Sequence, residues 1–216
     1  MAATLAMVGC ASGPVPPDWR AEALQAVQDA QAAYLKGDSA GEARQFERAR
    51  GEITRTGNPA LMARAELMRC ATHVASLVFE PCAGYDVLQA DAAPAERAYA
   101  AYLAGHAAAA DLALLPEAQR RVASAGASAD AALKEQPDPL SRLVAAGVLF
   151  QSGQASPATI ALAVDTASEQ GWRRPLLAWL YVQFERAKKA GDMAEAARLR
   201  RRIDLVLGPP SVKPAP

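Results

Sequence analysis

The chain has little of what enzymes and nucleic-acid-binding proteins commonly need. Its 216 residues include two histidines and three cysteines, and aromatic residues make up 6% of the composition. Lysine and arginine together number 23, the same as aspartate and glutamate, so no net positive charge attracts nucleic acid. No run approaches the roughly 18 apolar residues of a membrane-spanning helix. We therefore expect neither a nucleic acid partner nor a transmembrane helix.

Residues with the spacing of a catalytic or metal site are also missing. His73 and His106 each lack a Ser, Asp or Cys partner at the spacing of a known motif. There is no CxxC pair that would suggest zinc. We expect no catalytic residues, no metal and no cofactor, and hence no enzyme. The alternative is an envelope enzyme or small-ligand-binding protein with a site between helices, for example one acting on the cell wall. In that case distant carboxylates such as Glu80, Asp86 and Asp165 would have to meet in space.

What the chain has in quantity is apolar helix. Apolar residues make up 51% of the sequence, many of them alanine, which favours helix and close helix approach. Residues 139–171 show the pattern best, because an N-cap residue followed by proline opens each of two helical stripes and glycine closes each. Two short helices with facing stripes pack as an antiparallel hairpin. We predict similar hairpins over residues 19–56 and 175–207.

The hairpins resemble tetratricopeptide repeats. Gly147, Phe150 and Gly153 stand close to the spacing of the small residue, the aromatic and the turn glycine in that family, and Tyr181 and Phe184 begin a similar segment. The resemblance implies an all-α domain over residues 19–208, stacked as a right-handed superhelix, with an irregular α-bundle as the alternative. It also implies a surface for a protein or peptide partner.

The first residues concern location. Met7-Val8-Gly9-Cys10 resembles the lipobox of bacterial lipoproteins. That resemblance implies that residues 1–9 are the remnant of a signal peptide, that Cys10 carries the lipid, and that residues 10–18 are a tether. Ala11 after the cysteine favours the outer membrane, with the domain facing the periplasm. An ordinary apolar N-terminus is the alternative. Residues 209–216 are predicted to be a disordered tail.

The other two cysteines bracket an unusual loop. Cys70 and Cys82 would close about a dozen residues, and a bridge there would add roughly 3 kcal/mol by the chain-entropy model. Two buried thiols are the second interpretation and a metal site the third. The loop at residues 78–86 combines aromatic and acidic residues with proline and glycine, so it is our candidate for partner binding. The candidate residues are Phe79, Glu80, Tyr85 and Asp86. The alternative is that Phe79 and Tyr85 fill the end of the helical stack.

These patterns together predict a lipid-anchored, non-enzymatic scaffold for a protein or peptide of the bacterial envelope. Two further expectations bear on this prediction. The interhelical seams should be almost entirely apolar, and the charged residues of 42–55 should form a solvated face.

Overall fold

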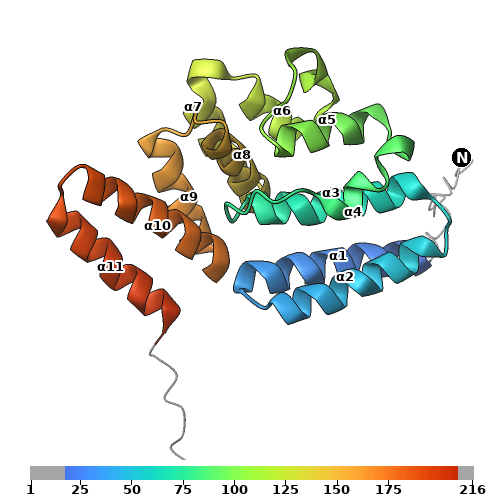
Figure 1. Cartoon of the computed structure of the whole chain (residues 1–216), viewed down its shortest axis with the longest axis horizontal. Coiled ribbons are helices and arrows are strands. Elements are labelled where there is room, and N and C mark those ends of the chain that lie inside the picture. The colour runs from blue at the N-terminus through green and yellow to red at the C-terminus, as the bar shows by residue number, and fades with distance from the viewer. Residues whose placement is uncertain (1–17, 209–216) are drawn as a thin grey trace, which may run out of the picture.

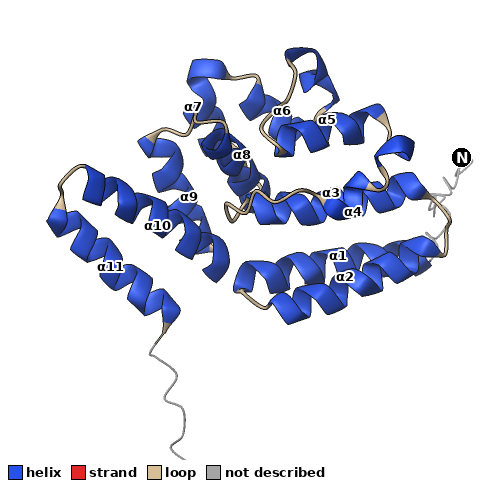
Figure 2. Ribbon diagram, viewed as in Figure 1, coloured by secondary structure: helices blue, strands red, loops and turns tan. Residues whose placement is uncertain are grey.

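The computed structural model describes residues 18–208, and these are helical with no strand (Figure 2). The all-α prediction is confirmed. The long helices are α1 (Asp18–Lys36), α2 (Ser39–Thr54), α3 (Pro59–Val74), α5 (Pro94–Leu103), α8 (Pro139–Gln151), α9 (Pro157–Glu169), α10 (Arg173–Lys189) and α11 (Met193–Leu207). The shorter ones are α4 (Ala83–Asp86), η1 (Gln89–Asp91), η2 (Ala109–Leu114), α6 (Glu117–Ala123), η3 (Gly126–Ser128) and α7 (Ala129–Lys134). None of the helices in this range is long and apolar enough to cross a membrane.

The predicted caps position the hairpins. The side chains of Asp38, Asp138 and Asp192 each accept a hydrogen bond from a backbone N–H in the first turn of the next helix. Ser156 forms a capping box with Thr159 at the start of α9. Short connections therefore join α1 to α2, α8 to α9 and α10 to α11. The two helices of each pair are in contact, as the predicted hairpins require.

Helix α3 lies at the centre of the fold. The α1–α2 hairpin packs on one side of it and α5 on the other, while α8 crosses its C-terminal end (Figure 1). Gly147 makes that crossing close, because a Cβ atom at this position would collide with the carbonyl oxygen of Val74. The fully buried Trp179 of α10 reaches the same end and donates its indole N–H to the Ala75 carbonyl at 3.1 Å. Three separate parts of the chain therefore meet where α3 ends.

Two predicted boundaries differ from the structure. In the sequence, Pro59 and the apolar stripe that continues through Val74 predict a helix reaching about Leu77. Helix α3 stops at Val74 instead, and Leu77 has a φ of 60°, which is incompatible with a right-handed helix. Helix α10 begins at Arg173 rather than Pro175, because proline is tolerated throughout a first turn, where its missing N–H has no intrahelical partner.

Candidate functional site

The sides of α3 carry buried charge, and the prediction of almost entirely apolar seams is wrong here. Three glutamate residues are at most 6% exposed, and the carboxylate of each accepts a hydrogen bond from an arginine. The pairs are Glu42 with Arg69, Glu66 with Arg50, and Glu96 with Arg64. Burying a carboxylate is costly unless it is paired and hydrogen-bonded, so these contacts are required by the burial itself.

Glu42 is the centre of the best-connected of these groups. It accepts hydrogen bonds from Arg69 Nε at 2.7 Å and from the Nε2 side of His73 at 3.1 Å. The His73 ring stacks on Tyr34 at 4.2 Å between centroids, and the guanidinium of Arg174 lies 4.2 Å from the centre of the same Tyr34 ring. This chain of contacts joins α1, α2, α3 and α10, and we call it the Glu42 network.

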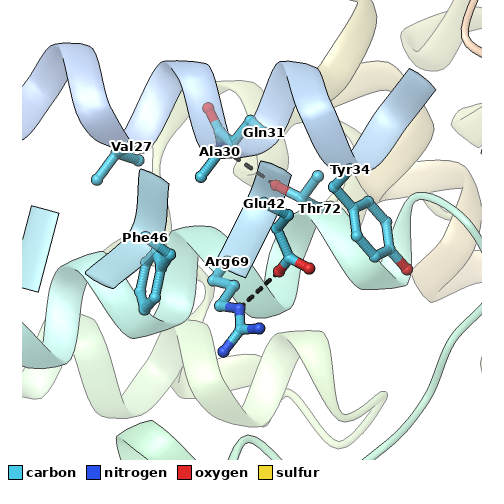
Figure 3. Close-up of a pocket in the computed structure, with 8 residues that line it drawn as sticks. All are labelled: Val27, Ala30, Gln31, Tyr34, Glu42, Phe46, Arg69 and Thr72. Carbon is cyan, nitrogen blue, oxygen red and sulfur yellow. Dashed lines mark hydrogen bonds and ion pairs between the residues drawn. The ribbon is translucent and has the colours of Figure 1, made fainter. Parts of the chain in front are cut away.

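The environment of Glu42 shifts its pKa in two opposing directions. Burial raises the pKa of this carboxyl, but the hydrogen bonds and charges of Arg69 and His73 outweigh burial and hold the pKa below its ordinary value. The cavity beside it is only about 10 Å³, which is enough for a single water molecule (Figure 3). Gln31 and Thr72 form a hydrogen bond at its edge. The Glu42 network is therefore a closed structural joint and offers no space for a substrate.

A much larger cavity lies on another side of α3, next to the candidate loop. Its volume is about 650 Å³, and it is formed by α3, the loop at residues 78–86, α5, the turn after α5 and the end of α8. We call it the loop groove. The residues of interest that line it are Glu66, Arg69, Cys70, His73, Phe79, Glu80, Cys82, Tyr85, Asp86, Arg97, His106 and Gln151. The loop groove therefore contains all four predicted partner-binding residues and both histidines of the chain.

The four predicted residues differ in accessibility. Glu80 and Asp86 are exposed, and Phe79 is half-buried, with its ring stacked on Phe150 at 6.4 Å. Tyr85 is only 2% exposed and packs in the core. The alternative interpretation, that this ring fills the end of the stack, describes Tyr85 better than an exposed contact does. Asp165, on α9, does not line the groove, so the three carboxylates of the enzymatic alternative do not come together there.

The cysteine pair lies where the loop meets α3. Cys70 and Cys82 lie at disulfide distance, with their Cα atoms 6.0 Å apart. Cys82 immediately precedes α4, where Gly84 lies so close to the Glu66 carboxylate that a Cβ atom at this position would overlap it. Among residues 18–208 no three His, Cys, Asp or Glu side chains form a group that could hold a metal ion.

Two polar atoms of the groove lining lack a protein partner. The Tyr85 hydroxyl and Gln151 Oε1 are both buried without a hydrogen bond. Burial raises the pKa of Tyr85. The negative charges of Asp86 and Glu96 raise this pKa further, and the positive charge of Arg97 lowers it by less than burial raises it, so the phenol stays a neutral hydrogen-bond donor. Buried polar groups normally have partners, so each of these atoms could form a hydrogen bond with a group bound in the groove.

Sequence reasoning missed the Glu42 network, although a signal for it was present. Glu42, Phe46, Ala49 and Ile53 follow helical spacing, and the last three form the buried stripe of α2. Glu42 therefore belongs to the buried face of this helix, not to its solvated side. A charge in line with an apolar stripe indicates a partner on the facing helix.

Comparison with known proteins gives no match, since no family model, no curated protein and no solved structure is similar to this chain.

Proposed function

We propose that this protein is a non-enzymatic, lipid-anchored scaffold of the bacterial envelope, and that it binds a partner protein or peptide in the loop groove. The observation that carries the proposal is the construction of the groove. Cys82 of the loop lies at disulfide distance from Cys70 of the central helix, and a bridge between them would give the groove a wall that loses little conformational freedom when a partner binds. Exposed Glu80 and Asp86 and half-buried Phe79 are the side chains that a partner would meet first.

The proposed anchor is Cys10, which lies outside the described residues. Its support is the lipobox-like sequence around it and the cysteine pair at disulfide distance, because disulfides persist in oxidising compartments such as the periplasm. The resemblance of the hairpin sequences to tetratricopeptide repeats supports a role in assembling other envelope proteins. Outer-membrane attachment, facing the periplasm, is part of the same proposal.

Site-specific cross-linking in cells tests the partner. A photoreactive amino acid at Glu80 should capture one envelope protein reproducibly, whereas the same amino acid at exposed Glu169 on α9 should not. Equal capture from both positions would contradict the assignment of the groove. Separately, Cys10→Ser should release the protein from membranes washed at high salt, which weakens purely electrostatic attachment. Unchanged retention after that wash would contradict the anchor.

The unpartnered atoms of the groove favour a second candidate function, the binding of a small polar ligand. A volume of about 650 Å³ lies within the usual range of ligand sites, and the Tyr85 hydroxyl and Gln151 Oε1 would orient the ligand. The test is native mass spectrometry of protein purified under gentle conditions. A bound small molecule that is lost in Tyr85→Phe would support this function, and an empty groove would support the protein partner.

A further inference from the structure

A second groove lies where α1 begins, and it is apolar. Its volume is about 550 Å³, and it lies between α1, the end of α2 and the start of α3. We call it the α1 groove. Its lining residues are Trp19, Arg20, Ala23, Leu24, Val27, Ile53, Leu61, Arg64, Ala65 and Met68. Leu24 is 53% exposed and lies at the edge of this groove beside buried Ala23 and Val27.

The charges in this groove are all of one sign. Arg20 and Arg64 are exposed at the surface of the molecule, and no acidic residue belongs to the lining. Arg64 pairs with the buried Glu96 outside the groove, so Arg20 supplies most of the charge that a headgroup would meet. Trp19 stands beside Arg20 at the first turn of α1. An aromatic residue, exposed aliphatic residues and arginine are the side chains that favour the interface between a bilayer and water. Arginine is also attracted by anionic headgroups.

The sequence places this groove close to the proposed anchor. Seven residues lie between Cys10 and Asp18, and the eight residue steps that join the two reach at most about 28 Å even when fully extended. The start of α1, which lines the groove, is therefore the part of the domain that an anchor at Cys10 holds nearest to the membrane. Figure 1 shows α10 and α11 at the far end of the molecule from the start of α1.

We propose that the α1 groove docks on the surface of an anionic phospholipid bilayer. This inference rests on the proposed lipid anchor, and it adds that the domain has a fixed orientation relative to the membrane. On α3, Leu61, Arg64, Ala65 and Met68 line the α1 groove, whereas Glu66, Arg69, Cys70 and His73 line the loop groove. The residues of the second set each lie five positions after those of the first. At about 100° per residue, the two sets therefore face directions about 140° apart around α3. Docking of the first face therefore points the loop groove away from the lipid, where a soluble partner reaches it.

The basic end of the chain is a weaker candidate for the same role. Lys188, Arg198 and Arg200 are paired with acidic side chains three or four residues away on their own helices. Those charges are satisfied locally and are not gathered around an apolar cavity. They behave as a solvated face, in line with the ordinary interpretation of such clusters.

Vesicle sedimentation tests the docking without the anchor. Full-length protein carrying Cys10→Ser is mixed with vesicles of phosphatidylcholine and phosphatidylglycerol in equal parts, or of phosphatidylcholine alone. We expect binding to the anionic vesicles that weakens with added salt. In this background Arg20→Glu should weaken binding at least about fivefold, since one cation near an anionic surface contributes about that factor. Leu24→Ser should also weaken it, and Leu205→Glu is the matched control because Leu205 is 81% exposed on α11.

The outcomes separate the two proposals. Loss of binding in both groove variants, with the control unchanged and all melting temperatures equal, supports docking. Equal binding of all variants would mean that the N-terminal residues bind lipid by themselves, and would overturn it. No binding by the Cys10→Ser protein, while the wild type stays in the membrane fraction of cells, would overturn the docking and leave the anchor intact. A wild type that is itself absent from the membrane fraction would instead overturn the anchor.

Discussion

Removing the charge of Glu42 should destabilise the fold by an amount that depends on pH. In Glu42→Gln, Arg69 loses the carboxylate that accepts from its Nε at 2.7 Å, and His73 loses its contact at 3.1 Å. Breaking a fully buried ion pair costs about 3–5 kcal/mol. The Arg69 side chain is 33% exposed, however, so water replaces part of the lost interaction. We therefore expect the free energy of unfolding at neutral pH to fall by about 2 kcal/mol.

The sign of the pH dependence follows from the lowered pKa of Glu42. A carboxyl whose pKa is lower in the folded state contributes stability that is fully present above its unfolded pKa, about 4.3. That contribution is lost as the pH falls through the lower folded value, where wild-type Glu42 also becomes neutral. The difference between the wild type and Glu42→Gln should therefore shrink below about pH 4.

Urea unfolding followed by circular dichroism measures this difference at about pH 7 and about pH 3. Glu47→Gln is the matched control, because Glu47 is on the same helix and pairs with Arg50 at 3.1 Å, but its side chain is 68% exposed. The control should change stability by less than about 0.5 kcal/mol. If Glu42→Gln destabilised the protein equally at both pH values, the lost charge would not be the cause, and our interpretation of the Glu42 network would be wrong.

Two further predictions concern the helix crossing and the cysteine pair. Gly147→Ala should lower stability by about 1–3 kcal/mol, because the new methyl group meets the Val74 carbonyl. Gly51, exposed in α2 with nothing near it, is the control, and Gly51→Ala should raise stability by about 1 kcal/mol. Thermal unfolding of both variants checks the difference in sign, and stabilisation by Gly147→Ala would refute the close crossing. Cys82→Ser should lower stability by about 3 kcal/mol. A reductant should lower the melting temperature of the wild type but not of this variant. An equal response of the two proteins to the reductant would show that no bridge forms.

Local signals predicted most of the helices. The cap-and-proline pairs at the starts of α8 and α9 and the aspartates before α2 and α11 each satisfy backbone N–H groups close by in the sequence. Such signals need no knowledge of the rest of the fold, so they can be read directly from the chain. The end of α3 is different, because no local signal in the sequence marks the positive φ of Leu77 that ends the helical path.

The contacts that build the candidate site are mostly long-range. Arg174 donates to the Tyr34 carbonyl across 140 residues, and the indole of Trp179 reaches Ala75 across 104. No spacing rule relates such residues. The loop at residues 78–86 could be singled out by its composition, which also allowed Tyr85 to fill the end of the stack. Its composition could not decide between an exposed and a buried Tyr85, because burial depends on residues far away in the sequence.

The paired charges along α3 also help to select a single packing register between helices whose seams are rich in alanine. Alanine seams such as Ala145, Ala146 and Ala163 present small, similar surfaces, so neighbouring registers of two helices differ little in the apolar area that they bury. A buried Glu42 is different, because sliding α2 by one turn along α3 would remove the carboxylate from Arg69 and leave both charges without a partner. The three glutamate–arginine pairs therefore act on register more than on net stability. They fix α3 relative to α2 and α5, and with it the relative positions of the two grooves on which both proposals depend.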